Sequence, residues 1–269
     1  MIITISRGSF SGGTVLAECV AEKLGYRLLS REILAAAAKR YGVAEDKLAR
    51  ALERAPGLWE RLGRERQLYI TYIQAALCEF LQEDNVVYHG HAGHLLLRGI
   101  THVLRVRIIA PMDYRIGAAM ASLRCGREEA EAHVRRVDED RARWTRFLYD
   151  IDWDSPLLYD LVVNLEGMSV ETACAVVRAT AGQPEFQPTV ASRKALRDLT
   201  LACRVRAALA KDEVTARLEV EVAADDGTAI LQGSLRDEEE AQTVRAVVAR
   251  VAGVAAVAAD RLGCWKYRP

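Results

Sequence analysis

The sequence predicts an α/β chain with a doubly wound, mainly parallel sheet, followed by a small α+β domain in αββαβ order. Three observations predict this class. Short apolar runs that suit buried strands alternate with helical patterns over residues 1–182. The segment QPEFQPTVASR, residues 183–193, has two prolines and no periodicity, which is typical of a linker. Beyond it, helix and strand signals follow in a different order.

The first part alternates strands with helices, as a parallel sheet with helical crossovers requires. MIITIS is short and β-branched, and residues 14–24 have apolar side chains at helical spacing before Gly25, a typical helix stop. Further strands are predicted in NVVYHG, THVLRVRIIA and LYDLVVN. Further helices are predicted at 31–41, 45–54, 64–82, 93–99, 112–123, 128–149 and, with Ser169 as N-cap, 169–182.

The C-terminal part has its own pattern. A helix is predicted at 195–210, followed by a strand in which Leu218, Val220 and Val222 alternate with polar residues. After the turn DDG come the strand TAILQGSL, a helix at 238–251 and the strand VAAVAADRL. We therefore expect one domain at 1–182, a linker at 183–194 and a second, independently folding domain at 195–269.

Composition excludes several classes of protein. Lys plus Arg equals Asp plus Glu at 37 each, so overall charge does not favour nucleic acid as a partner. No apolar run reaches the ~18 residues of a membrane span, and MIITISRG lacks the pattern of a signal peptide, so we expect a cytoplasmic protein. The six cysteines form no CxxC pair, which predicts reduced thiols instead of disulfides or a zinc site.

A glycine-rich loop follows the first strand in ISRGSFSGGTVL. Gly8, Gly12 and Gly13 can free backbone N–H groups to bind phosphate at the start of the next helix, and Gly8 to Gly13 has the GxxxxG spacing of the P-loop. Thr14 stands where that motif has lysine, although its hydroxyl can serve Mg²⁺ or phosphate. From spacing alone, a phosphate site and a tight structural connection both remain open.

ISRGSFSGGTVLAECVAEKLGYRLLSREIL resembles the opening of the cytidylate kinase-like family, which usually lacks the loop lysine. The segments VLRVRIIAPMDYRI, EEAEAHVRRVDEDRA and DWDSPLLYDLVVN resemble the same family in the same order, so the likeness spans about residues 1–182. The residues that carry the first match are Ser6, Arg7, Ser11, Gly12, Gly13, Lys23, Leu24, Gly25, Arg31, Glu32 and Ile33.

The resemblance implies a fold of the P-loop NTPase type and a nucleoside monophosphate kinase that transfers a phosphoryl group from ATP to CMP or a related nucleotide, with Mg²⁺. It implies three sets of site residues. These are Gly8, Ser11, Gly12, Gly13 and Thr14 at the ATP phosphates; Arg31, His91 and Arg115 at the substrate, Arg115 also on the lid side; and Arg136, Asp138 and Arg141 as catalytic residues on a lid helix.

The predicted lid helix has a physical reason for its charge. Phosphoryl transfer needs alignment of two nucleotides and cations on the transferring group, and without a loop lysine arginines must supply that charge. Arg136, Asp140 and Arg143 share one helical face by spacing, and Asp138 can hold a lid arginine. The alternative is a solvated charged helix with surface ion pairs.

Two further departures from the family pattern favour a rival function. Ser30 stands where the family has aspartate, and His91 where it has arginine, which binds phosphate better than neutral imidazole. With Thr14, they suggest a nucleotide sensor with weak or no kinase activity. His89, His91 and His94 are close enough in the sequence to suggest a zinc site. No Cys or carboxylate lies at a suitable spacing beside them, so no metal ligand is predicted. They are expected to line the nucleotide cleft or to pack structurally.

Residues 196–262 resemble a BON domain, through the turn at Gly227, the Leu231-x-Gly233 pattern and the Gly253-Val254 pair. That resemblance implies a phospholipid or protein partner. Dimerisation or regulation of the neighbouring domain is an equally open role, and a homodimer is one outcome. A third reading is a lipid-associated scaffold in which the kinase fold is only structural.

Overall fold

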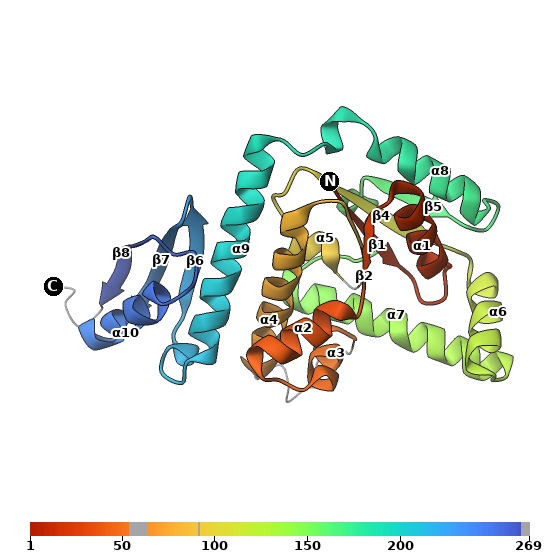
Figure 1. The fold of residues 1–269 in the computed structure, drawn as a ribbon. Coiled ribbons are helices and arrows are strands. Elements are labelled where there is room, and N and C mark those ends of the chain that lie inside the picture. The colour runs from red at the N-terminus through yellow and green to blue at the C-terminus, as the bar shows by residue number, and fades with distance from the viewer. Residues whose placement is uncertain (54–63, 91, 265–269) are drawn as a thin grey trace.

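The computed structural model describes residues 1–53, 64–90 and 92–264, and Figure 1 shows their arrangement. The first part is a five-stranded parallel sheet with the order β2-β3-β1-β4-β5. Its strands are β1 (Ile2–Arg7), β2 (Arg27–Leu29), β3 (Val86–His89), β4 (Val103–Ile109) and β5 (Leu161–Asn164). This architecture confirms the predicted doubly wound sheet, although the short edge strand β2 was not predicted.

Helices cover both faces of this sheet, because its strands are apolar on both sides. α1 (Gly13–Leu24) and α8 (Val170–Ala181) pack on one face around Ile3, Ile5 and Val106. The other face, around Ile2 and Val103, is covered by α2 (Glu32–Tyr41), α3 (Glu45–Glu53), α4 (Arg64–Phe80) and α5 (Gly93–Leu96). Ser169 caps α8 as predicted, because its hydroxyl accepts the Thr172 N–H.

Two further helices extend from the carboxyl edge of the sheet. α6 (Met112–Leu123) and α7 (Arg127–Tyr149) pack against each other through Ile116, Ala119, Ala130 and Val134. The far end of α7 is anchored in the main core by Trp144, which is fully buried and donates from Nε1 to the Ala51 carbonyl at 2.7 Å. α7 therefore crosses the molecule along the carboxyl edge (Figure 1).

The C-terminal part contains a three-stranded mixed sheet, as the αββαβ pattern predicts. β6 (Val220–Asp225) pairs antiparallel with β7 (Thr228–Leu235), and β7 pairs parallel with β8 (Ala256–Cys264). The helices α9 (Val190–Lys211) and α10 (Glu238–Ala249) pack on this sheet around a small core that includes Leu231 and Val244. The 3-10 turns at 81–83, 156–158, 184–186 and 215–217 complete the elements.

Helix α9 links the two parts more closely than the sequence suggested. It begins at Val190, inside the predicted linker, and not at residue 195. Leu196, Cys203 and Ala207 are buried in the same core as α4, while the other side of α9 packs on β6. In Figure 1 this helix stands between the small sheet and α4, so it belongs to both packing layers.

Candidate active site

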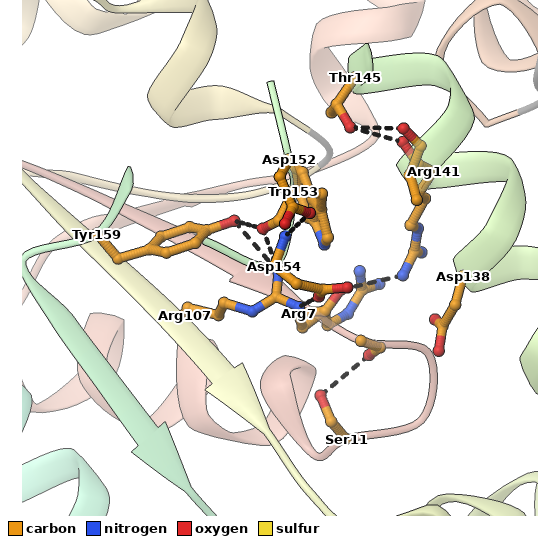
Figure 2. Close-up of polar contacts among 12 residues, drawn as sticks. Arg7, Ser11, Arg107, Asp138, Arg141, Thr145, Asp152, Trp153, Asp154 and Tyr159 are labelled. Atoms are coloured by element: carbon orange, nitrogen blue, oxygen red, sulfur yellow. Dashed lines mark hydrogen bonds and ion pairs between the residues drawn. The ribbon is translucent and has the colours of Figure 1, made fainter. Parts of the chain in front are cut away.

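The glycine-rich loop lies between β1 and α1, at the carboxyl edge of the sheet, where doubly wound proteins bind ligands. Ser11 closes the loop: its hydroxyl donates to the Gly8 carbonyl at 2.9 Å and its N–H to the same carbonyl at 3.4 Å (Figure 2). Gly12 has φ +82°, a backbone conformation that favours glycine, and it opens α1 as the N-cap residue. Ser11 and Gly12 thus shape the loop.

Arg115 of α6 lies directly on this loop. A Cβ atom at Gly8 would be 3.2 Å from the Arg115 Cζ, so the approach of the guanidinium depends on the missing side chain. Arg115 Nε also donates to the Ser9 carbonyl at 2.7 Å. A permanent positive charge is thereby held against the loop, from α6 instead of from the usual lysine position.

Two residues of α7 form hydrogen bonds with the same loop. Asp138 Oδ1 accepts the Ser9 N–H and the Ser9 hydroxyl, both at 3.3 Å, and Asp138 forms an ion pair with Arg115. Arg141 donates from Nη1 to the Arg7 carbonyl at 3.0 Å, as Figure 2 shows. α7 therefore brings one carboxylate and one guanidinium to the loop, and Asp138 holds Arg115 in place.

The other predicted residues are placed differently. The exposed Arg136 contacts Nδ1 of His133 at 3.2 Å and is not brought to the loop. Thr14 is exposed in the first turn of α1, next to Gly13, whose missing side chain leaves room for Arg7. Arg31 is exposed at the start of α2. His91 lies outside the described residues.

Arg107 is a candidate site residue that the sequence analysis included in the family-like segment VLRVRIIAPMDYRI but did not assign to the site. It is 7% exposed on β4 and donates to the Trp153 carbonyl at 3.3 Å and to the Tyr159 hydroxyl at 3.2 Å. It also forms an ion pair with Asp154, and its guanidinium lies over the rings of Trp153 and Tyr159 (Figure 2). The available signal was an arginine within the otherwise apolar VRII end of a predicted buried strand.

A cavity of about 230 Å³ connects these groups. It is lined by Gly8 of the loop, by Arg107 and Arg115, and by the carboxylates of Asp138 and Asp154. Guanidinium groups from β4 and α6 thus face one hollow at the end of the central strands. Such a hollow can take a small anion that contacts the loop and both arginines.

His89 and His94 are buried inside the protein. His94 accepts or donates a hydrogen bond through Nδ1 with the Ser6 hydroxyl at 3.0 Å, and its ring lies 4.8 Å from that of Tyr159. Burial lowers the pKa of His94 to about 3, helped by Arg105 and Arg107, and burial with Arg7 and Arg141 lowers the pKa of His89 to about 3. Both imidazoles are therefore neutral at pH 7. Within residues 1–53, 64–90 and 92–264 no cluster of three His, Cys, Asp or Glu could hold a metal ion.

The comparisons with known proteins agree with this architecture. The chain is 29% identical over 182 residues to a cytidylate kinase of Archaeoglobus fulgidus. This alignment covers 66% of the present chain and 92% of the archaeal protein. It is 28% identical to a cytidylate kinase of Methanocaldococcus jannaschii, in an alignment that covers 66% of the present chain and 95% of that kinase. A crystal structure of an uncharacterized protein from Eubacterium ventriosum has the same fold, with a TM-score of 0.51 at 20% identity, covering 67% of this chain and 98% of that one.

Two family models match separate parts of the sequence. The model of the BON domain matches residues 197–262, which confirms the predicted resemblance of the C-terminal part. No helix among the described segments is long and apolar enough to cross a membrane. The model of the cytidylate kinase-like family matches residues 2–167, more than half of the sequence, and the chain belongs to that family.

Proposed function

We propose that the protein is a nucleoside monophosphate kinase that transfers the γ-phosphoryl group of ATP to CMP or a related monophosphate. The observation that carries this proposal is the convergence of Arg115, Asp138 and Arg141 on the glycine loop. Membership of the cytidylate kinase-like family and the likeness to cytidylate kinases support it. The preferred base is left to experiment.

The loop would bind the donor phosphates. Its N–H groups lie at the start of α1, where the helix dipole adds positive potential. In the structure, the Asp138 carboxylate accepts one of these N–H groups, that of Ser9. A phosphate oxygen can take the same position, so ATP binding would displace Asp138 from Ser9 while the Asp138 ion pair keeps Arg115 oriented.

Arginines would supply the charge that a loop lysine normally provides. Arg115 donates to the Ser9 carbonyl and Arg141 to the Ser9 hydroxyl, and Arg107 lines the adjoining cavity from β4. Guanidinium groups bind phosphate through paired N–H donors and keep their charge at every relevant pH. Fixed in this way, they stabilise the charge that develops during in-line transfer, which is the main demand of this reaction.

Thr14, Arg31 and His91 are the residues proposed for Mg²⁺ and for the acceptor nucleotide. The exposed Thr14 hydroxyl is an oxygen donor of the kind Mg²⁺ prefers. When bound with ATP, Mg²⁺ would neutralise phosphate charge. Arg31, exposed at the start of α2, and His91 are proposed for the acceptor nucleotide, with Arg115 between donor and acceptor.

A nucleotide sensor is the second candidate. It is favoured by Thr14 in place of lysine and by Ser30, whose N–H and hydroxyl are both directed to Glu32 at 2.7 and 3.4 Å and so do not extend toward a nucleotide. Because α9 packs on α4, an occupied nucleotide site could shift the C-terminal region. In that case a phospholipid, a protein or a second copy of the chain would bind the shifted C-terminal region.

The deciding experiment is direct detection of product. Purified protein is incubated with Mg-ATP and, separately, CMP, dCMP, UMP, AMP and GMP, and diphosphates are resolved by ion-pair chromatography. The Arg141→Ala variant, prepared in parallel, controls for contaminating kinases. Product formed only by the unmutated protein supports the kinase and identifies its acceptor. ATP binding without product from any acceptor would replace the kinase with the sensor.

A further inference from the structure

A second cavity, of about 470 Å³, lies where the C-terminal region meets helix α2. Its walls are the end of α2, the last turns of α9, and the end of α10 with the turn that follows. It shares no lining residue with the cavity beside the glycine loop. The kinase reaction proposed above makes no use of it.

Four cationic side chains line this cavity, and they come from three helices. Arg40 belongs to α2, Arg204 and Lys211 to α9, and Arg250 follows α10 as its C-cap residue. Glu79 of α4 forms ion pairs with both Arg40 and Arg204, at 2.9 Å to Nε of Arg204. One carboxylate is thus shared by two guanidinium groups.

Asp212 is the acidic residue of the lining, and its carboxylate is already engaged. Asp212 Oδ1 accepts the Thr215 N–H at 2.9 Å and the Val214 N–H at 3.1 Å. The Thr215 backbone hydrogen bond, with Arg250 nearby, lowers the Asp212 pKa, so the group stays charged. Asp212 and Glu79 together balance half of the four cations.

Lys211 and Arg250 are the two cations that remain. Among the residues that the structure places, neither forms an ion pair with a carboxylate. Both are exposed, and both line the same cavity. Since Glu79 is shared by two arginines and Asp212 lies near Arg250, the four cations and two carboxylates leave a net charge of +2 for an external anion.

The floor of the cavity is apolar. Ala207, Ala208, Val247 and Val251 line it, and beside them lies the Tyr41 ring, which is stacked at 4.1 Å and 5° on Tyr72. This stack fixes the Tyr41 ring in one orientation. An apolar floor with a few convergent charges, at a volume within the usual ~300–1,000 Å³, is the character of a small-molecule site.

We propose that this cavity binds a phosphorylated small molecule, with the phosphate between Lys211 and Arg250 and an apolar or aromatic body on the floor. A phosphate monoester carries about −1.5 to −2 charges at pH 7, which matches the two unbalanced cations. Because the walls belong to α2, α9 and α10, the bound molecule would tie the C-terminal region to the first part of the chain. Binding here does not depend on the kinase activity.

The test uses the full chain and phenyl phosphate as the probe, with phenol as its uncharged counterpart. Affinity is measured by isothermal titration calorimetry for the unmutated protein, for Lys211→Glu/Arg250→Glu and for the milder Lys211→Gln/Arg250→Gln. Lys23→Glu/Arg261→Glu is the matched control, because it changes net charge equally at two exposed residues outside the cavity. All four proteins are first compared by circular dichroism and thermal melting.

We expect phenyl phosphate to bind the unmutated protein and the control equally, and phenol to bind more weakly. Charge reversal is expected to weaken binding by about tenfold or more, and neutralisation by less, since each lost contact is charge-assisted. Equal binding to all four proteins would overturn the proposal, because the probe would then bind elsewhere, such as the glycine loop. Failure to bind the unmutated protein, with retention on anionic vesicles through Lys211 and Arg250, would overturn it in favour of a lipid surface.

Discussion

Asp138 of α7 accepts both the backbone N–H and the hydroxyl of Ser9, at 3.3 Å each. A carboxylate from α7 thus uses a loop donor that the proposed reaction needs for phosphate. The same carboxylate holds Arg115 by an ion pair, so Asp138 has two opposed effects on catalysis.

The first prediction separates these two effects. Asp138→Asn removes a negative charge that competes with phosphate, so the KM for ATP should fall about threefold, by the ~0.7 kcal/mol typical of one exposed electrostatic contact. At the same time kcat should fall about tenfold or more, because Arg115 loses its orienting partner. Steady-state kinetics with varied ATP measures both constants. An unchanged kcat would show that Arg115 needs no support from Asp138.

Arg141 and Arg146 offer a matched pair on one helix. Arg141 donates to the Arg7 carbonyl of the loop, whereas Arg146 is exposed in the last turn of α7. Arg141→Ala should lower kcat/KM by roughly 10²- to 10³-fold, the usual cost of losing one preorganised donor to a transferring group. Arg146→Ala should leave kcat/KM within about twofold. Equal losses in the two variants would point to a general effect of charge on α7.

The sequence predicts the helices, strands and loop that carry this site better than it predicts which side chains meet there. The order of strands and helices follows from periodicity, and the loop from Gly8, Gly12 and Gly13, because these signals are local in the chain. Strand β2 is not predicted, because its three residues are too few to show an alternation of apolar and polar side chains. Which charged residues of α7 reach the loop depends on how the helix is rotated, which Trp144 fixes through the distant Ala51.

The same distinction explains Arg107 and Arg136. Arg136 lies on a charged helix in the sequence, yet it meets His133 on the exposed side of α7. Arg107 is hidden in an apolar strand, yet it is buried against Trp153 and Tyr159, which are more than 40 residues away. Spacing within one helix shows which residues share a face, and only tertiary packing shows what that face meets.

The buried histidine His94 should make stability depend on pH. Burial lowers its pKa to about 3 from the ordinary 6.5, so the unfolded chain takes up a proton below pH 6.5 while the folded chain does not. Stability from this group is complete above pH 6.5 and is lost as the pH falls toward 3, at up to ~1.4 kcal/mol per pH unit. Thermal melting between pH 7 and 5 should therefore show a falling midpoint.

A comparison of variants isolates the contribution of His94. In His94→Gln the slope of the melting midpoint against pH should be smaller, whatever the absolute loss of packing. His133→Gln is the control, because His133 is only partly buried, between Arg136 and the Phe10 ring. Carboxylates titrate mainly below pH 5, outside the chosen range. The same slope in all three proteins would mean that His94 is protonated in the folded state.

The last prediction concerns the boundary between the two parts of the chain. Leu196, Cys203 and Ala207 of α9 are buried against α4, and the Cys78 and Cys203 sulfur atoms lie 4.0 Å apart across this contact. Gln82 adds a hydrogen bond to the Thr200 hydroxyl at 2.6 Å. Removing α9 would expose the apolar face of α4 to water, at a cost of about 1.5 to 3 kcal/mol for each large side chain uncovered.

Two truncations test whether the first part needs this helix. A chain of residues 1–212 keeps α9 on α4 and should melt cooperatively, at a higher temperature than a chain that lacks α9. A chain of residues 1–189 lacks α9 and should melt at a lower temperature or aggregate through the uncovered face of α4. If 1–189 instead melts as the full chain does, residues 1–182 fold independently, as the sequence alone suggested, and α9 merely rests on them. If it fails while 1–212 succeeds, α9 is a structural part of the kinase-like fold, and any ligand that moves α9 acts on the same core that supports α2 and α4.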